Sequence, residues 1–437
     1  MNPILVKTLQ LLLSLSILIV LHELGHFIPA KLFKTRVEKF FLFFDVKFAL
    51  FKKKIGDTVY GIGWLPLGGY VKIAGMIDES MDTDQMQGPA QPWEFRSKPA
   101  WQRLIIMIGG VTVNLIVGFV IYTMLIYNSG TIEIKPDQMP QGFMVNDIMK
   151  PYGFQDGDKI LSINGKELEN QLDINRYLLV RDVSNVEVQH QSGVTEVLHL
   201  PDTIGMHIFR QNVMMPFATY SNTVIDTVVT DMPAYKAGIM KGDKVLSVNG
   251  TEVTYFNDIS PLIQPNSPTN VIVDRNGAQE TIEVTADANG KLGISSNELI
   301  DYSHKEYSFG EAISEGASYG YWTLHDYVVQ MKFIFTKQGA SQVGGFGSIG
   351  NMFPPEWDWT AFWEKTALIS IILAFMNILP IPALDGGHVL FLLYEMITGR
   401  KPSDKFLEYA QMVGFFIVIA LVLYANGNDL YRLIFKG

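Results

Sequence analysis

The chain has 437 residues, of which 48% are hydrophobic, and it carries a formal net charge of −10. With its positive mean hydropathy, this composition is too apolar for an ordinary soluble enzyme and too polar for a many-span transporter. We therefore expect membrane-spanning and aqueous parts in one chain. The sequence contains no cysteine, which excludes thiolate zinc ligands, cysteine nucleophiles and disulfide bonds.

Four apolar stretches reach the length of about 20 residues that a helix needs to cross a bilayer. They cover residues 4–28, 104–127, 364–384 and 407–425. No small-residue cleavage site follows the first stretch, so we expect it to be retained rather than removed as a signal peptide. Lysine and arginine are concentrated between the first two stretches. The positive-inside rule therefore places residues 31–103 in the cytoplasm and residues 128–363 outside, together with both termini.

The first apolar stretch contains the pattern H-E-x-x-H at His22, Glu23 and His26. In an α-helix, residues 22 and 26 lie one turn apart on the same face, so both imidazoles can bind one ion. In this pattern the two histidines bind Zn²⁺ and the glutamate acts as a general base for water. Ionisable groups at membrane depth are costly and normally mark function. This cost favours a metal site over a plain signal anchor.

The segment expected in the cytoplasm contains a region whose composition is typical of β-strands. Residues 58–75 are rich in β-branched, aromatic and glycine residues and predict one or two short strands with glycine-rich turns. Such a strand edge can accept an extended peptide, whereas the alternative is a surface hairpin that closes the loop. Residues 78–92 predict a flexible acidic loop. In the second span, we expect the amide of Asn114 to join helices rather than to take part in catalysis.

The outside segment contains an internal repeat. Residues 153–167 recur as residues 238–252, at an offset of 85 residues that is the size of one small domain. Each copy predicts a strand followed by an Asn-Gly turn, and both copies resemble PDZ domains in their G-D-x-[IVL]-L-x-[IV]-N-G run. Residues 129–303 contain 23 acidic and 12 basic residues. This balance predicts no nucleic-acid partner.

After the repeat, residues 308–337 predict an amphipathic helix on the outer leaflet, and residues 339–352 predict a glycine-rich loop. The chain is thus predicted to be a multi-span α-helical membrane protein with four transmembrane helices, a membrane-associated β-hairpin and two extracytoplasmic PDZ-like α+β domains. The predicted domains are residues 1–127 (two spans, the metal motif and the β segment), 128–220 and 221–303 (PDZ-like), 304–362 (amphipathic helix and loop) and 363–437 (two spans).

A third zinc ligand must lie outside the motif, because tetrahedral catalytic zinc takes three protein ligands and keeps one position for water. Glu38 is a candidate by residue type, although its lysine-rich surroundings suggest a surface charge. Asp385 is the other candidate, because the topology brings it to the same side of the membrane as His22 and His26. It lies in a run of proline and glycine that ends at His388, for which we expect a supporting role rather than ligation.

At this point the chain resembles the bacterial site-2 proteases, in particular the regulator-of-sigma-E protease type. The resemblance covers nearly the whole length. It is carried by H-E-x-x-H in span one, P-L-G-G-Y-V-K-[IM]-x-G at residues 66–75, K-P-x-W-x-R before span two, the tandem PDZ-like pair, and N-x-x-P-x-P-x-L-D-G-G-H at residues 377–388.

The resemblance implies a set of site residues. The zinc ligands would be His22, His26 and Asp385, and the catalytic base would be Glu23. Asn377 would contact the substrate backbone near the site.

The resemblance also implies that the strands at residues 58–75, with Gly68 and Gly69, form a membrane re-entrant edge that binds substrate. The sequence departs from the family pattern in two places. Gly109-Gly110 replaces Ala-Gly-Pro, and residues 345–347 replace Gly-Pro-Ile. We expect neither departure to touch the metal.

The implied activity is zinc-dependent endopeptidase cleavage of single-span membrane proteins, such as anti-sigma factors or remnant signal peptides, in regulated intramembrane proteolysis. The implied location is the bacterial inner membrane, with the active site near the cytoplasmic side and the PDZ-like domains in the periplasm. The expected partners are these substrates and the lipid bilayer.

Two other classes of protein compete with this interpretation. A membrane-bound PDZ scaffold with a structural metal site would have no use for the intact Glu23. A metal transporter would need more than a single cluster, and the sequence contains no matching inverted repeat.

Overall fold

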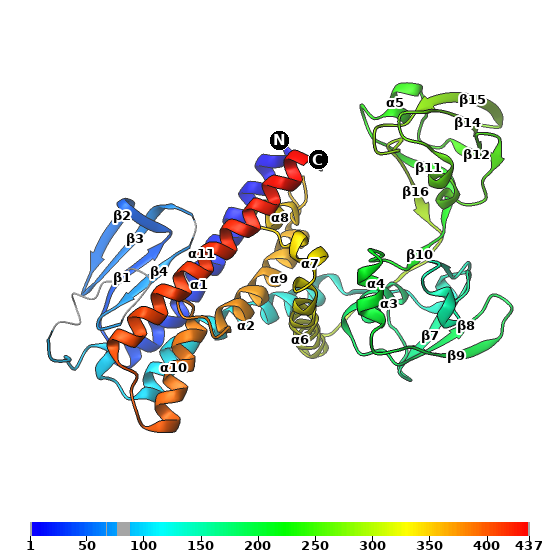
Figure 1. Ribbon diagram of the computed structural model, residues 1–437. Helices are drawn as coiled ribbons and strands as arrows, with labels where there is room; N and C mark the ends of the chain where they lie inside the picture. Colours follow the sequence, from blue (N-terminus) through cyan, green and yellow to red (C-terminus); the bar gives the residue numbers. More distant parts are fainter. Residues whose placement is uncertain (1, 67, 77–87, 436–437) are drawn as a thin grey trace. The chain divides into compact units, whose positions relative to one another are not determined.

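The computed structural model describes residues 2–66, 68–76 and 88–435. The chain forms two compact units, of which one combines residues 1–130 with 306–437 and the other consists of residues 131–305 (Figure 1). We call them the helical unit and the inserted unit.

Within the described residues, four helices of the helical unit are long and apolar enough to cross a membrane, as the sequence predicts. They are α1 (Pro3–Leu32), α2 (Ala100–Ser129), α9 (Trp359–Ile378) and α11 (Asp404–Phe435). The third span differs in position from its predicted range, since α9 begins five residues earlier and ends at Ile378. It ends there because the residue before a proline avoids the helical conformation, and Pro380 and Pro382 follow directly.

Helix α2 packs against α1, α9 and two further helices of the helical unit. A Cβ atom on Gly25 of α1 would lie 2.6 Å from the carbonyl carbon of Gly109 in α2, closer than real contacts allow. The two backbones therefore touch at this crossing, because both positions lack a side chain. This contact holds the part of α1 that carries His22 and His26 against α2.

A four-stranded sheet lies beside α1 (Figure 1). Its strands are β1 (Val37–Leu42), β2 (Phe44–Ile55), β3 (Thr58–Leu65) and β4 (Tyr70–Ile73), in the order β2-β3-β1-β4. The two short strands predicted within residues 58–75 are confirmed as β3 and β4, but they do not form a hairpin, because β1 separates them and pairs with both. The hairpin is instead formed by β2 and β3. Lysines on an exposed edge strand such as β2 conceal its strand character in the sequence, although they are a common protection against edge pairing.

The remaining helices of the helical unit are α6 (Phe309–Ile334), α7 (Lys337–Gln342), α8 (Phe346–Asn351), α10 (Asp385–Thr398) and the short η2 (Phe95–Ser97). Helix α6 matches the helix predicted for residues 308–337. The predicted glycine-rich loop at 339–352 is wrong in part, since α7 and α8 occupy most of it. Most of the acidic loop predicted at 78–92 lies outside the described residues, which resume at residue 88.

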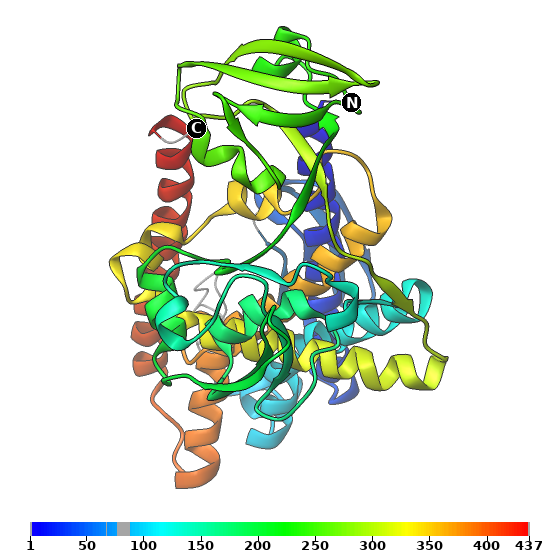
Figure 2. The same cartoon turned by 90° about the vertical axis from the view of Figure 1, so that its right-hand side faces the viewer.

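The inserted unit consists of short strands and helices around two separate apolar cores, which appear as two groups of strands in Figure 2. The first core draws on residues 134–217 and the second on residues 225–292. The elements are β5 (Thr131–Glu133), η3 (Pro136–Gln138), β6 (Phe143–Val145), η4 (Lys150–Tyr152), β7 (Lys159–Ile163), η5 (Gln171–Asp173), α3 (Ile174–Val180), β8 (Asn185–Gln189), β9 (Thr195–His199), α4 (Ile204–Arg210), β10 (Phe217–Thr219), β11 (Ser221–Val228), α5 (Pro233–Ala237), β12 (Lys244–Val248), β13 (Thr251–Glu252), η6 (Phe256–Asp258), η7 (Ser260–Leu262), β14 (Pro268–Arg275), β15 (Ala278–Thr285), β16 (Ile294–Glu298) and β17 (Ser303–Lys305). Assignment of the two cores as PDZ-like domains stays a prediction.

The sequence repeat has a counterpart in buried ion pairs of the two cores. Asp158 and Asp243 are 85 residues apart and are 0% and 1% exposed. Asp158 Oδ1 lies 2.7 Å from His190 Nδ1, whereas the guanidinium of Arg275 donates to both oxygens of Asp243 at 2.8 and 2.7 Å. His190 and Arg275 are also 85 residues apart, so each copy pairs the same buried carboxylate with a cation at the same position.

This difference in cation predicts that the stability of the first core depends on pH near neutrality and that the stability of the second core does not. The hydrogen bond with Asp158 raises the pKa of His190 above its ordinary value. A raised histidine pKa means that the pair stabilises fully below the unfolded value of about 6.5 and is lost as the pH rises through the folded value. We expect the first core to lose about 1–3 kcal/mol of stability in that range. Hydrogen exchange of the full chain, read by mass spectrometry, measures the protection of each core.

The second core serves as the internal control, because Arg275 stays charged throughout this pH range. His190→Arg should remove the pH dependence of the first core. Equal pH dependence of both cores, corrected for the intrinsic exchange rate, would contradict the prediction.

Candidate metal centre

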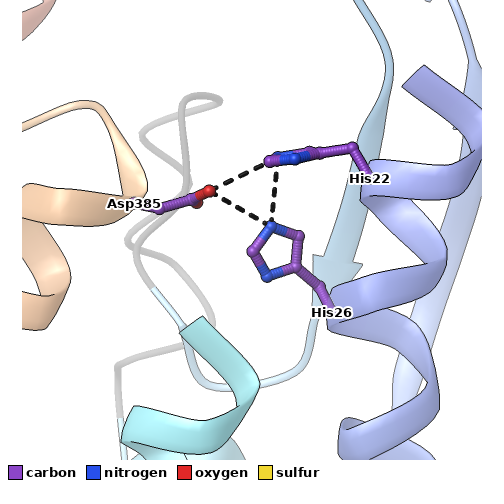
Figure 3. Close-up of side chains that lie close together, drawn as sticks. All are labelled: His22, His26 and Asp385. Atoms are coloured by element: carbon purple, nitrogen blue, oxygen red, sulfur yellow. Dashed lines mark hydrogen bonds and ion pairs between the residues drawn. The ribbon is translucent and has the colours of Figure 1, made fainter. Parts of the chain in front are cut away.

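Two histidines and one aspartate, distant in sequence, converge at one point in the helical unit. His22 and His26 project from adjacent turns of α1, and Asp385 begins α10 (Figure 3). The two Nε2 atoms are 3.3 Å apart, and Asp385 Oδ2 lies 3.3 Å from that of His22 and 3.4 Å from that of His26. Within the described residues, this is the one group of potential metal ligands that meets at a single point.

The spacing of these atoms suits zinc. Donor atoms at about 2.0–2.1 Å from a tetrahedral zinc ion lie about 3.3–3.4 Å from each other. All three measured separations fall in this range. Two imidazole nitrogens and one carboxylate oxygen also leave one tetrahedral position for water, as a catalytic zinc site requires. The residues present therefore fit the ion.

The hydrogen bonds around the site support the same assignment. Asp385 Oδ2 is buried and accepts no hydrogen bond within the described residues. An unsatisfied buried carboxylate oxygen is costly unless a cation binds it. His26 Nδ1 donates to the carbonyl oxygen of Ile106 at 2.8 Å, which leaves the lone pair on Nε2 directed at the common point.

Asn114 of α2 joins helices, as the sequence predicts, but its partner on α1 is the candidate ligand His22. Its side-chain amide lies 3.2 Å from His22 Nδ1, and its Oδ1 is buried without a partner. The nitrogen and oxygen of a side-chain amide are assigned from the hydrogen-bond network, so this amide can equally be turned by half a turn. Oδ1 would then accept a hydrogen bond from His22 Nδ1–H, which satisfies both of these atoms and leaves His22 Nε2 free for a metal. Asn114 thus supports His22 as the Ile106 carbonyl supports His26. The only sign of this role in the sequence was the presence of a polar residue within an apolar span.

We expect Asn114→Leu to lower the affinity for zinc by about 10- to 100-fold, because outer partners of this kind orient a ligating histidine and fix its tautomer. The measurement is zinc retention against a series of chelators of known affinity. Asn128→Leu is the matched control, since Asn128 is an exposed residue of the same helix. Equal zinc retention by the two variants would contradict the role of Asn114.

Gly110 lies directly against the two imidazoles. A Cβ atom at this position would come within 2.6 Å of His22 Cε1 and closer still to His26 Nε2. The expectation that the Gly109-Gly110 departure stays away from the metal site is therefore wrong. Absence of a side chain at both positions is what allows α2 to approach the ligands of α1.

Glu23 lines a cavity of about 50 Å³ together with the three candidate ligands. This volume has room for an ion and a water molecule, whose share of liquid volume is about 30 Å³. Tyr70 and Val71 of strand β4 line the same cavity, so the edge of the sheet reaches the site. A carboxylate in this position can accept a proton from water held at the metal.

The other predicted site residues lie at different distances from this cavity. Gly69 is beside Glu23, since a Cβ on it would lie 3.6 Å from Glu23 Cγ, whereas Gly68 faces the ring of Phe44. Asn377 belongs to α9 and is not part of the cavity lining. Their contacts with substrate stay predictions.

Two alternatives for the metal ligands are resolved by position. Glu38 lies in β1 and has its carboxylate 3.9 Å from Lys72 Nζ, away from the histidines, so it is not the third ligand of this cluster. His388 lines the cavity one turn after Asp385 but does not belong to the cluster of ligand atoms.

The fold holds Asp385 at the site through the segment between α9 and α10. Ala383 has a left-handed backbone with φ of 91°, a strained conformation for a residue with a side chain, and its N–H donates to Gln411 Oε1 at 3.1 Å. Gly387 lets the first turn of α10 pack on this segment, since a Cβ there would lie 2.6 Å from the carbonyl oxygen of Ile381. Farther along, Glu395 pairs with the buried Arg103 of α2 at 2.5 Å. Strain and buried polar contacts at one carboxylate are typical of a functional site.

A buried site with two histidines, an aspartate and an adjacent glutamate, built within apolar helices long enough to span a bilayer, defines the class of membrane-embedded zinc metalloprotease. The sequence pattern of peptidase family M50 matches residues 10–421, and the chain belongs to this family. The protein is therefore a zinc-dependent metalloendopeptidase of the site-2 protease type.

Relatives with similar sequences carry corresponding names. The chain is 27% identical over 445 residues to the "Regulator of sigma E protease" of Haemophilus influenzae, covering 97% of this chain and 98% of the relative. It is 24% identical over 450 residues to the "Zinc metalloprotease RasP" of Geobacillus kaustophilus, covering 98% of this chain and 99% of the relative.

Proposed function

We propose that this protein cleaves single-span membrane proteins within the membrane, in regulated intramembrane proteolysis. The observation that carries the proposal is the meeting of His22, His26 and Asp385 beside Glu23, in a cavity bounded by helices long enough to span a bilayer. A peptide bond at this depth is accessible to few other hydrolases, because hydrolysis needs water in an apolar medium.

In this proposal His22, His26 and Asp385 hold Zn²⁺, which supplies Lewis-acid activation of water and stabilisation of developing negative charge. Glu23 accepts the proton of the attacking water and returns it to the leaving amine nitrogen. The Ile106 carbonyl and Asn114 keep the two imidazoles oriented throughout.

The edge of β4 is proposed to hold the substrate in extended form. A helical substrate hides its carbonyl groups in internal hydrogen bonds, so it must unwind before cleavage. Strand β4 is at one end of the sheet order and contributes Tyr70 and Val71 to the cavity. Addition of a substrate strand at this edge would satisfy the backbone groups that unwinding exposes. Gly68, Gly69 and Asn377 are the proposed additional substrate contacts.

The proposed substrates are anti-sigma factors already shortened outside the membrane, or remnant signal peptides. The name of the Haemophilus influenzae relative, a regulator of sigma E protease, supports the first of these. The proposed location is the bacterial inner membrane, with the metal site near the cytoplasmic face and residues 128–220 and 221–303 forming periplasmic PDZ-like domains. These domains would then exclude substrates with bulky ectodomains.

Cleavage of a single-span test substrate by the purified protein tests the proposal. We expect cleavage with zinc, loss of cleavage on addition of a zinc chelator and recovery on return of zinc. Cleavage sites, read by mass spectrometry, should lie inside the apolar segment of the substrate. Cleavage that continues in the chelator, or that maps only to aqueous loops, would refute the function.

A further inference from the structure

A second cavity, distinct from the metal site, lies where α1 ends. Its volume is about 440 Å³, and it shares no lining residue with the cavity around Glu23. The lining contains the cations Lys31, Lys34 and Arg36, the anion Asp57, and the uncharged residues Thr35 and Trp93. The cavity therefore carries an excess of two positive charges.

The cations of this cavity have few partners of their own. Among the described residues, no ion pair or side-chain hydrogen bond engages the side chain of Lys34 or Arg36. Lys31 Nζ donates to the hydroxyl of Thr58 at 3.0 Å and lies 5.6 Å from the centroid of the Phe27 ring, so neither contact gives it an anionic partner. A concave surface with unpaired cations attracts anions more strongly than a flat one.

The backbone at Lys34 is unfavourable for lysine. This residue follows the helix end with a left-handed φ of 54°, and Thr35 N–H closes the turn on the carbonyl oxygen of Ala30 at 2.8 Å. Glycine is the residue usually found in this position, because a side chain is strained in the left-handed region. A cation near a helix C-terminus does interact well with the helix dipole. Lys31, however, already supplies that interaction from the last turn without strain.

A buried hydroxyl is the second sign of a ligand. Thr35 is 2% exposed, and its Oγ1 has no hydrogen-bond partner within the described residues. Buried hydroxyl groups are normally satisfied, so an unsatisfied one in a cavity wall calls for an explanation. Rotation of this side chain toward the cavity would let the hydroxyl donate to a phosphate oxygen.

The surroundings of the cavity have the composition expected at a membrane surface. It lies at the end of an apolar helix of 30 residues, and two large apolar side chains nearby are exposed, Leu32 at 74% and Trp101 at 50%. Phe33 joins these neighbours through an edge-to-face contact with Trp101, at 5.4 Å between ring centroids. Aromatic and basic side chains together are typical of the level of lipid headgroups.

We propose that this cavity binds a phosphate group, held by Lys31, Lys34 and Arg36 with Thr35 as an additional donor. Arginine and lysine in combination recognise the charge and the oxygen geometry of phosphate. The phosphate can come from an anionic phospholipid headgroup or from a soluble phosphate, and the experiment distinguishes the two. The site is independent of the proteolytic function proposed above.

The test uses the full-length protein in detergent, with native mass spectrometry to count bound phosphatidylglycerol or phosphatidylcholine and with inorganic phosphate as competitor. Lys34→Gly is the decisive variant, because it removes the cation and relieves the backbone strain, so the fold is kept. We expect about a tenfold loss of phosphatidylglycerol affinity, the scale of one charge-assisted contact. Arg36→Gln, which leaves the backbone bonds of this residue intact, should give a similar loss.

Lys47→Gly is the matched control. Lys47 is an exposed lysine of β2 with a left-handed φ of 67°, and it does not line the cavity. Its substitution should change the affinity less than twofold, an expectation on the order of surface-charge effects.

Each outcome has a defined meaning. Phosphatidylglycerol binding that is sensitive to Lys34→Gly identifies the lipid headgroup as a source of the phosphate. Lys34-dependent binding of inorganic phosphate without lipid preference identifies the soluble source. Binding of neither, or an equal loss in Lys34→Gly and Lys47→Gly, would overturn the proposal, because the second result indicates only diffuse charge attraction.

Discussion

Glu23→Gln is expected to lower the rate of peptide-bond cleavage by about 10²- to 10⁴-fold while the protein keeps its zinc, because general acid–base catalysis contributes this factor. Glu23 lines the metal cavity but is not one of the three clustered ligands. Glutamine has the same shape and cannot accept the proton. Initial cleavage rates on a single-span substrate and zinc content by elemental analysis measure the two effects on the same preparation.

The control for this variant is Glu364→Gln, the same substitution at an exposed glutamate of α9. It should leave both rate and zinc content unchanged. Retention of full activity by Glu23→Gln would end the assignment of Glu23 as the base. Loss of zinc together with activity would instead indicate that Glu23 helps to bind the ion.

Asp385→Ala is expected to reduce bound zinc to well below one ion per chain and cleavage to background. The carboxylate lies 3.3–3.4 Å from both Nε2 atoms, so its removal leaves two ligands of three. We expect the zinc affinity to fall by more than about 100-fold, because that is the upper range for losing a residue that only hydrogen-bonds to a metal ligand. Zinc retention during dialysis against chelators, followed by cleavage assays, measures both quantities.

Two control variants, one at an aspartate and one at a glutamate, make this test specific. Asp404→Ala removes an exposed carboxylate at the start of α11, and Glu38→Ala removes the alternative ligand in β1. Both should retain zinc. Stoichiometric zinc in Asp385→Ala would show that the cluster does not depend on this residue.

The two substitutions separate chemistry from metal binding. Glu23→Gln should give an inactive protein with zinc, and Asp385→Ala an inactive protein without it. Added zinc in excess should therefore restore activity partly to Asp385→Ala, through weak binding by His22 and His26, and not at all to Glu23→Gln.

The amino-acid sequence alone determined the features that depend on neighbours along the chain. The apolar stretches predict four spans because helix length and bilayer thickness are both constants. Two histidines four residues apart must share a helix face, so two of the three candidate metal ligands were predictable from a motif of five residues. The repeat at an offset of 85 residues likewise matches the paired ions Asp158–His190 and Asp243–Arg275.

Tertiary structure decided whatever depends on contacts between distant segments. Asp385, rather than Glu38, reaches the histidines because α10 packs on α2 and the left-handed turn at Ala383 directs the start of α10, with Asp385, toward them. Pairing of β1 with both β3 and β4 replaced the predicted hairpin, since strand order is set by packing and not by adjacency. Asn114 became a partner of His22 only because Gly25 and Gly109 let two helices touch. Local patterns specify which side chains share one face of an element, whereas the meeting of two elements is a property of the whole fold.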